Sequence, residues 1–547
     1  MNSEKYTLYK NANVQTVDKE NPKAESFIVK DSKFLFVGSE EDSRKKLEGK
    51  EFDEINLESN LVLPGFNDSH LHFLHYAKGL LNVNLTGTRS IDELKTRLKE
   101  KLESRDKEDN FWLEGEGWNQ DYFVDEKRFP TKEDLDEVST EVPILIMRAC
   151  FHIGVLNSKG LELLELNSSN ASEYGNLIEV FPNGEPNGVI KENLLENVKS
   201  KKPGFDYNLT KDILLKAQEK AFEQGLTSVQ SDDFGYVPNQ DFNLLFDLFK
   251  DLYEEDKLKL RISEQCLFLN VKDEEKFFNE GYHYGWGNET YRISTVKILS
   301  DGSLGARTAA LRNGYNDDSS TKGIMLFTQE ELDEMVLLSH ENKCPVAIHG
   351  IGDRAIEMAL NSIEKAKKTY PDIKLRHGIV HCQITDEELL NRFKELEVMA
   401  LVQPIFIDYD MNIVSDRVGE ELSKTSYAWK TMKDKGINVS FGTDAPVEPF
   451  DTMPNIYSAV TRKNITGDEE KTYLEKEKMS MEDAIYAYTY ESAYASGEEE
   501  IKGTISPGKL ADFIVLDRDL FNLENDKEIL DTKVLETYVG GQLVFRR

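Results

Sequence analysis

The sequence has little of what builds disulfide-stabilised, membrane-spanning or nucleic-acid-binding proteins. Only four cysteines occur in 547 residues, without paired spacing, which indicates buried free thiols rather than a disulfide framework. No apolar run approaches the length of a membrane span. Basic residues number 67 against 101 acidic ones, a net charge of −34, so nucleic acids and anionic membranes are disfavoured as partners.

The beginning of the chain also lacks the basic and apolar regions of a signal peptide. Together with the free cysteines, this predicts a protein of the reducing cytoplasm. The 547 residues, 39% of them hydrophobic, suffice for a large core and more than one domain. The charge is spread along the chain in mixed-sign stretches that are typical of solvated surface, so it does not identify a substrate.

The middle of the chain predicts an α/β fold. Strands there alternate with helical segments, which implies a parallel sheet, and eight such strands imply a closed (β/α)8 barrel over residues 61–499. The candidate strands are residues 61–67, 226–231, 260–268, 293–299, 345–349, 375–381, 399–403 and 438–442.

The two ends and one long segment depart from this alternation. Short alternating strands before residue 60 and after residue 500 predict a small β-sandwich domain assembled from residues 1–60 and 500–547. The stretch from about 80 to 205 is too long for one crossover and carries its own strand at 143–148. We expect it to be an insertion after the first barrel strand that covers the barrel mouth.

Histidine is scarce as well, with nine in the chain, so its placement is informative. Residues 64–72 read PGFNDSHLH, and in a strand His70 and His72 point to the same side. Two such imidazoles can bind one divalent metal ion. Taken alone, the pair could equally be surface or hydrogen-bonded histidines.

Further polar residues fall at or near the carboxyl ends of the predicted strands, the edge where barrel enzymes place their chemistry. Lys297 lies in the fourth strand, and His349, His381 and Asp444 close the fifth, sixth and eighth. Neutral imidazoles and carboxylate oxygens suit Zn²⁺. The sequence therefore predicts a metal centre at one end of the barrel.

This pattern resembles the metal site of the amidohydrolase superfamily, and in particular its amidohydrolase-3, or YtcJ-like, branch, which includes N-substituted formamide deformylase-like and exoenzyme-regulatory-like proteins. The resemblance spans essentially the whole chain and is carried by residues 64–72, 152–158, 184–188, 296–307, 349–355, 403–404, 443–447 and 508–512. It implies that the metal ligands are His70, His72, Lys297, His349, His381 and Asp444.

A lysine in a buried strand is costly unless its charge is compensated. The resemblance implies that Lys297 is carboxylated and that its carbamate bridges two metal ions. The alternative is a salt bridge from Lys297, with Asp301 as the nearest candidate, and a mononuclear site.

The same resemblance implies a hydrolytic reaction. A metal-bound water has a pKa lowered toward neutrality and supplies a hydroxide nucleophile. Asp444 is placed to accept the proton and return it to a leaving amine. Its alternative role is a turn or cap residue before Ala445 and Pro446.

Substrate-side residues are expected in the insertion and around the barrel mouth. Arg148, His152 and Asn157 resemble residues of that kind, although a lone histidine after an apolar run can be structural, and Trp118 is either a pocket residue or a core residue. The remaining candidates are Asp301 and Arg307, which follow the fourth strand, Gln403 after the seventh, and Asp353 as the group that orients His349.

The sequence thus predicts a metal-dependent hydrolase that cleaves a carbon–nitrogen amide-type bond in a small molecule, an N-acyl or N-formyl amine. Ester, lactone or cyclic-amide hydrolysis on the same scaffold and a non-enzymatic metal-binding regulator are the alternatives. Deamination is disfavoured. The deaminases of this superfamily carry a glutamate shortly after the histidine of the fifth strand, whereas this chain reads HGIGD over 349–353 and has no glutamate there. A homodimer is compatible with the sequence.

Overall fold

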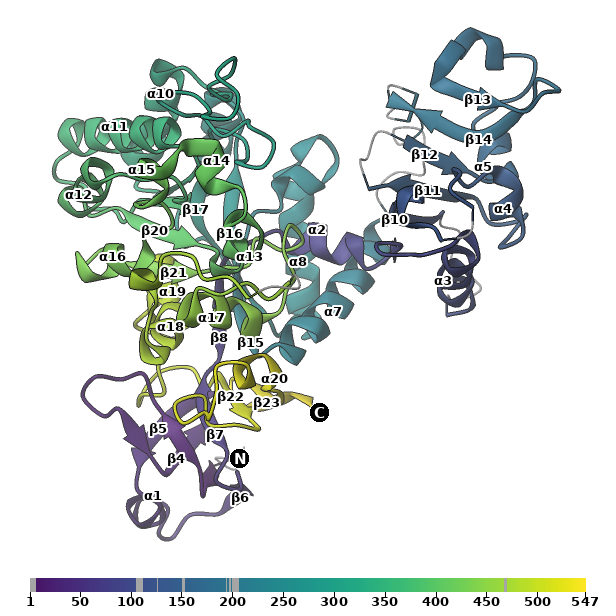
Figure 1. Ribbon diagram of the computed structural model, residues 1–547. Coiled ribbons are helices and arrows are strands. Elements are labelled where there is room, and N and C mark those ends of the chain that lie inside the picture. Colours follow the sequence, from purple (N-terminus) through teal and green to yellow (C-terminus); the bar gives the residue numbers. More distant parts are fainter. Residues whose placement is uncertain are drawn as a thin grey trace. The chain divides into compact units, whose positions relative to one another are not determined.

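The computed structural model describes residues 6–104, 112–124, 126–149, 153–192, 194–195, 198, 206–466 and 470–547. The chain forms two compact units (Figure 1). One comprises Met1–Tyr76 with Leu214–Arg547, and the other comprises Ala77–Ile213. Among the described residues, no helix has both the length and the apolar character needed to cross a membrane.

The larger unit contains an eight-stranded parallel barrel. Its strands follow one another in chain order: β8 (Phe66–Leu71), β15 (Leu226–Ser231), β16 (Arg261–Leu267), β17 (Tyr291–Leu299), β18 (Val346–Gly350), β19 (Gly378–His381), β20 (Met399–Val402) and β21 (Val439–Phe441). Beyond the last strand, the Asp444 amide donates to the His70 carbonyl at 2.9 Å and the His72 amide donates to the Ala445 carbonyl at 2.8 Å. These two bonds join the first strand to the last.

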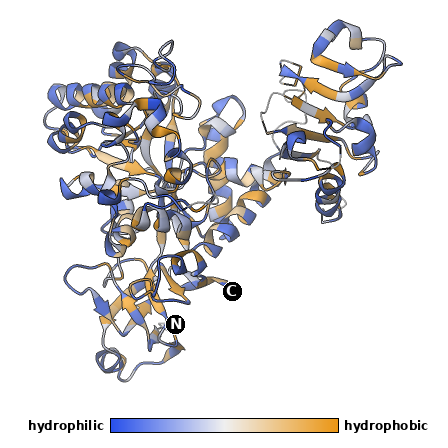
Figure 2. Ribbon diagram, viewed as in Figure 1, coloured by the Kyte–Doolittle hydropathy of each residue, from blue (hydrophilic) through white to orange (hydrophobic). Residues whose placement is uncertain are grey.

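Helices follow most of the strands. They are α8 (Phe242–Glu254), α9 (Val271–Asn279), α10 (Gln329–Glu341), α11 (Asp353–Thr369), α12 (Glu387–Glu395), α13 (Ile407–Asp410), α14 (Val414–Val418), α15 (Glu420–Ser423), α16 (Trp429–Asp434), α17 (Thr452–Thr461), α18 (Met481–Tyr488) and α19 (Tyr490–Ala495). Local signals start them: Thr328 and Glu331 form a capping box at α10. In α11 the buried Ile356, Ala359 and Ile363 recur at helical spacing, and hydrophilic residues cover the other face (Figure 2).

One predicted strand was wrong. The stretch 61–67 is two strands, because β7 (Leu61–Pro64) pairs with β22 (Phe513–Leu516) and β2 (Asn13–Gln15), and only β8 enters the barrel. The chain changes sheets at Gly65, where a Cβ atom would lie 2.1 Å from the Thr227 hydroxyl. The other seven predicted strands match barrel strands to within three residues at each end.

Both chain ends contribute to one sheet. Its six strands run in the order β24-β23-β22-β7-β2-β3, and a four-stranded sheet has the order β5-β4-β1-β6. Tyr9, Phe27, Phe513 and Tyr538, from both ends of the sequence, share one aromatic cluster in which the last two rings stack at 4.4 Å. The remaining bounds are β1 (Tyr6–Lys10), β3 (Lys23–Ala24), β4 (Ser26–Lys30), β5 (Lys33–Gly38), α1 (Glu40–Lys46), β6 (Phe52–Asn56), α20 (Glu528–Asp531), β23 (Val534–Val539) and β24 (Gln542–Arg546).

The smaller unit has its own six-stranded sheet of order β13-β14-β12-β11-β10-β9. The strand predicted at 143–148 is β11 (Ile144–Arg148) of this sheet. The other elements are β9 (Val83–Asn84), α3 (Ile91–Glu103), β10 (Leu113–Trp118), α4 (Lys132–Asp136), β12 (Ile153–Leu156), α5 (Ser158–Leu163), β13 (Ile178–Val180) and β14 (Pro186–Lys191), and α2 (Phe73–Gly79) and α7 (Tyr207–Glu223) contain the boundaries between the units.

A buried ion pair connects the barrel to the sheet of the chain ends. Arg261, at the start of β16, donates to both carboxylate oxygens of Asp512 at 2.6 and 3.0 Å. The Gly540 amide donates to the same carboxylate at 2.8 Å, and the Gly65 amide donates to the Asp512 carbonyl at 3.0 Å. Asp512 therefore holds together β16, the β7–β8 junction and the carboxyl-terminal hairpin.

Replacing Asp512 by alanine should destabilise the protein by about 3–5 kcal/mol, because the Arg261 charge would stay buried without its partner. Calorimetry should show a large fall in the thermal midpoint. The matched control is Glu41→Ala, which removes an exposed ion pair with Lys45 and should change the midpoint little. Equal midpoints for the two variants would contradict the proposed connection.

Candidate metal centre

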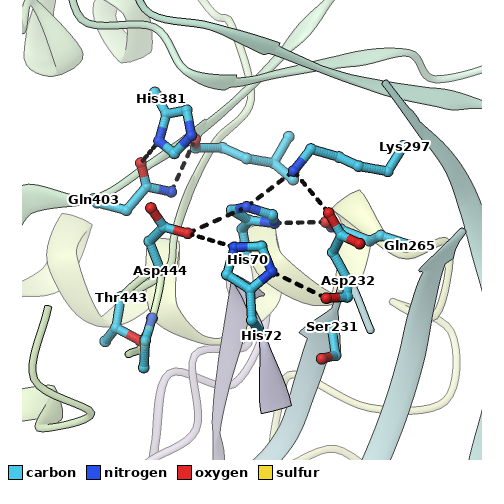
Figure 3. A network of polar contacts seen from close by, with 12 residues as sticks. His70, His72, Ser231, Asp232, Gln265, Lys297, His381, Gln403, Thr443 and Asp444 are labelled. Atoms are coloured by element: carbon cyan, nitrogen blue, oxygen red, sulfur yellow. Dashed lines mark hydrogen bonds and ion pairs between the residues drawn. The ribbon is translucent and has the colours of Figure 1, made fainter. Parts of the chain in front are cut away.

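Three predicted ligands converge where the first and last barrel strands meet (Figure 3). His70 lies in β8, His72 follows its end, and Asp444 follows β21. The Oδ1 atom of Asp444 is 3.1 Å from His72 Nε2 and 3.5 Å from His70 Nε2. The donor atoms of these three residues lie within 4.8 Å of one another, a spacing at which they could hold one metal ion.

The other predicted ligands adjoin this triad. The His381 ring is 5.7 Å from the His70 ring, and the His349 ring is 4.5 Å from the His381 ring. Lys297, in β17, places its Nζ atom 3.1 Å from His70 Nε2. The structure thus gathers all six residues into one cluster at the carboxyl ends of the barrel strands, in which only His72 is partly exposed.

The backbone is strained at two cluster residues. His381 has a φ of 78° and Asp444 a φ of 60°, in the left-handed region that residues other than glycine seldom adopt. Such conformations persist only where surrounding contacts enforce them, and they concentrate at functional sites. Here they turn the two side chains toward the His70 ring (Figure 3).

A common arrangement orients the four imidazoles. In each, Nδ1 faces an oxygen acceptor: Gln265 Oε1 for His70 at 2.7 Å, the Asp232 carbonyl for His72 at 3.0 Å, Asp301 Oδ1 for His349 at 2.8 Å and Gln403 Oε1 for His381 at 2.7 Å. A proton on each Nδ1 satisfies these acceptors and leaves Nε2 with a free lone pair, the form of histidine that binds metals.

The orientation of both glutamine amides is fixed independently. Gln265 Nε2 donates to the Ser69 carbonyl at 3.0 Å, and Gln403 Nε2 points to the Leu401 carbonyl at 3.4 Å. Their Oε1 atoms must therefore face the histidines. The donor set fits a divalent ion that prefers nitrogen and oxygen ligands, such as Zn²⁺.

The electrostatics agree with neutral imidazoles at two positions. Burial and the nearby Lys297 hold the pKa of His70 well below its usual range, and burial lowers the pKa of His381 to about 3. Burial also opposes a charge on His72, but the hydrogen bond and the charge of Asp444 outweigh it and raise the pKa of His72 to about 9. Burial disfavours the Asp444 carboxylate too, yet the surrounding histidines hold its pKa well below the usual range.

Two expectations about neighbouring carboxylates were wrong. Asp301, not Asp353, accepts from His349, while Asp353 begins α11 and accepts from the Arg312 amide at 2.9 Å. The ion-pair partner of Lys297 is Asp232 at 3.3 Å, not Asp301. Asp301 is already occupied, because it also accepts from the amides of Gly352 and Ala310, both at 2.9 Å.

Sequence reasoning missed Gln265 and Asp232. The one available signal was their position, Gln265 within and Asp232 directly after a predicted barrel strand. Asp232 contributes its carbonyl to His72 and its carboxylate to Lys297, and the sequence separations involved range from 65 to 195 residues.

The candidate substrate residues have other contacts. Trp118 is buried in the core of the smaller unit, where Arg148 donates to Gln120 Oε1 at 2.9 Å and Asn157 caps α5. Arg307 pairs with Asp317 at 2.8 Å on the exposed loop after β17. His152 lies outside the described residues.

A parallel barrel with His-x-His at the end of its first strand, two later histidines and an aspartate after its last strand has the site of a metal-dependent hydrolase. The model of the amidohydrolase family matches residues 53–545. The chain is 31% identical to the YtcJ protein of Bacillus subtilis over 98% of both chains, and 24% identical to N-substituted formamide deformylase of Arthrobacter pascens over 98% of both.

A solved structure agrees with these matches. An uncharacterized metal-dependent hydrolase from Pyrococcus furiosus has a TM-score of 0.76 and 29% identity, covering 94% of this chain and all of that one. The chain therefore belongs to the amidohydrolase family, and it is an enzyme, a hydrolase that depends on a bound metal ion.

Gln265→Leu should weaken metal binding about 10- to 100-fold, because the His70 ring loses the acceptor that fixes its orientation. Competition with a chelator of known affinity measures the change. Gln230→Leu is the matched control, since Gln230 is an equally buried glutamine that donates to the Ser492 carbonyl at 2.7 Å. Equal metal affinity in both variants would exclude the orienting role.

Proposed function

We propose that this enzyme uses Zn²⁺ to hydrolyse the carbon–nitrogen bond of an N-acyl or N-formyl amine. The observation that carries the proposal is the set of four imidazoles whose Nδ1 atoms are all anchored, together with Asp444 beside them. Similarity to N-substituted formamide deformylase over 98% of both chains supports the substrate class.

The residues that would hold the metal are His70, His72, His349, His381 and Asp444. A divalent ion held there supplies Lewis acidity toward a carbonyl oxygen and lowers the pKa of a bound water. The protein contributes fixed ligand directions and a buried site, since His70, His381 and Asp444 are each at most 6% exposed.

Asp444 suits the proton transfer that an amide substrate needs. An amine leaves readily only when its nitrogen is protonated, so a group that takes a proton from water must return it to that nitrogen. Asp444 lies beside two ligand nitrogens, those of His70 and His72, and its low pKa keeps it ionised and able to accept a proton. An ester does not need protonation of its leaving group to the same degree.

Lys297 is proposed to carry a carbamate. An ammonium group 3.1 Å from His70 Nε2 would repel a cation held by that nitrogen. Addition of CO₂ to the neutral amine, with loss of one proton, turns this positive group into an anionic oxygen ligand that could bridge a second ion. The alternative is an ammonium group paired with Asp232 and a single metal ion.

Substrate contact is assigned to Arg148 and His152 of the insertion and to Arg307. Asp301 and Gln403 are instead proposed to orient His349 and His381, since those imidazoles already occupy them. Trp118 supports the insertion core.

The buried free thiols of Cys266, Cys344 and Cys382 support a cytoplasmic location.

Asp444→Asn should retain most of the metal and lose turnover by about 10²- to 10⁴-fold, because an amide side chain keeps an oxygen ligand but cannot carry the proton. Elemental analysis and steady-state kinetics on an N-formyl amine provide the two measurements. Near wild-type turnover with normal metal content would assign the proton transfer to another group.

Lys297→Ala should lose the second metal ion, and short carboxylic acids should restore part of the activity. Carbon-13 NMR of protein equilibrated with labelled bicarbonate should show a carbamate resonance that this variant lacks. A wild-type spectrum without that resonance would favour the Asp232 ion pair and a mononuclear site.

The substrate class is tested with matched pairs of N-acyl amines, esters, lactones and cyclic amides on zinc-loaded protein. The proposal expects kcat/KM to be highest for the acyclic amides. Preferential ester or lactone cleavage would replace the proposed reaction with that alternative, and no turnover of any pair would favour a metal-binding regulator.

A further inference from the structure

A cavity of about 860 Å³ lies at the barrel end opposite the metal cluster. Its lining includes Arg376, which precedes β19, Met399, which begins β20, and Asn438, which precedes β21. Parallel strands place their amino ends at one edge, so this cavity lies at the amino-terminal face. Residues of α12, α16, α18 and α19 line it as well. All of its lining residues belong to the larger unit.

The cavity concentrates positive charge on a strongly acidic protein. Two acidic residues, Glu397 and Glu491, line it, against six basic ones: Lys19, Lys367, Lys374, Arg376, Lys394 and Lys433. The chain as a whole carries a net charge of −34. Basic groups collected in this way repel one another unless an anion compensates them.

The contacts of these basic groups differ. Arg376 pairs with Glu499 and Lys433 with Asp483, both at 2.7 Å, and Lys367 donates to the Leu396 carbonyl. Within the part of the chain that the structure describes, the side chains of Lys374 and Lys394 make neither a hydrogen bond nor an ion pair. Burial lowers the pKa of Lys367, and the Lys374 charge lowers it further against the opposing effect of Glu397.

Aromatic rings form part of the same wall. Tyr486 and Tyr490 stack with ring centroids 5.0 Å apart, and Lys19 Nζ lies 5.0 Å from the Tyr486 centroid. The Arg376 guanidinium lies 3.7 Å from the Tyr494 centroid. Lys509 Nζ lies 5.6 Å from the Tyr490 centroid, so these tyrosine faces are already covered. The edges of the tyrosine rings and the planar guanidinium can still contact a flat ring beside the lysines.

We propose that this basic pocket binds a small polyanion that carries an aromatic ring, the chemistry of a phosphorylated aromatic compound such as a nucleotide. The lysines would bind the anionic groups and the tyrosines the ring. The cavity holds about 860 Å³ and the chain as a whole carries a net charge of −34, which favours a small molecule over a nucleic-acid strand. This second site is independent of the hydrolytic reaction proposed above.

The test is a fluorescence titration of wild-type protein with the aromatic trisulfonate pyranine, which is a poor metal chelator. We expect saturable binding, and displacement by adenosine monophosphate at lower concentration than by inorganic phosphate. Absence of saturable binding would overturn the proposal. Equal displacement by the two competitors would overturn its aromatic part and indicate a phosphate site.

Two double variants with the same change in net charge locate the site. Lys374→Glu with Lys394→Glu should weaken pyranine binding by about tenfold or more, since attraction becomes repulsion within the cavity. Lys272→Glu with Lys343→Glu, at exposed positions outside the cavity, should leave binding near wild type. Equal loss in both would show non-specific attraction to charge and overturn the assignment.

The aromatic wall is tested by Tyr490→Leu, which keeps apolar bulk and removes the ring. The advantage of adenosine monophosphate over inorganic phosphate should disappear, while the affinity for phosphate itself stays the same. An unchanged preference would remove Tyr490 from the site and contradict ring contact with this wall.

Discussion

The directions of the four imidazoles in the metal centre depend on oxygen acceptors that hold their Nδ1 atoms. A buried histidine without such a partner would rotate or exchange tautomers, and its Nε2 atom would no longer point in one direction. Asp301 follows β17 and serves His349 on β18, while Gln403 follows β20 and serves His381 on β19. Three of the four acceptors thus follow a neighbouring strand, and Gln265 reaches His70 from β16, which is separated from β8 by β15. The strand order and register of the barrel therefore determine which nitrogen of each ring is free.

The opposite end of the larger unit has a structural function. The Asp512 carboxylate accepts hydrogen bonds from Arg261 of the barrel and from the Gly540 amide of the carboxyl-terminal hairpin. At Gly65 the chain passes from the sheet of the chain ends into β8. A separation of this kind is general for such barrels, in which residues at the amino-terminal face maintain stability and those at the carboxyl-terminal face perform chemistry. Here the residue that precedes the first barrel strand, Gly65, donates to Asp512, which lies more than 400 positions further along the chain.

The sequence was sufficient to predict the barrel and the proximity of the six cluster residues. Apolar runs mark buried strands, and polar side chains at the ends of parallel strands share one edge of the sheet. It was insufficient where local pattern and tertiary pairing diverge. The apolar run before Gly65 looks like a barrel strand, yet its partners β2 and β22 come from the two chain ends. Asp353 was a reasonable partner for His349 by proximity in sequence, but its position at the start of α11 directs it to Arg312. Gln265 acts on a histidine 195 residues away, and no local signal encodes such a distance.

The closure of the barrel and the metal centre involve the same residues. Asp68 accepts from the Thr443 amide at 3.0 Å and from the Thr443 hydroxyl at 2.7 Å, across 375 residues of sequence, directly beside the bonds between His70 and Asp444 and between His72 and Ala445. His70 and His72 lie on one side of this junction between the first and last strands, which we call the seam, and Asp444 lies on the other. The affinity for the ion and the cohesion of the two strands are therefore thermodynamically linked. Any substitution that loosens the seam, even one without a donor atom, lowers the affinity for the ion, and any ion that fits the ligands poorly weakens the closed barrel. Selectivity for the metal is in this sense a property of the whole closed sheet.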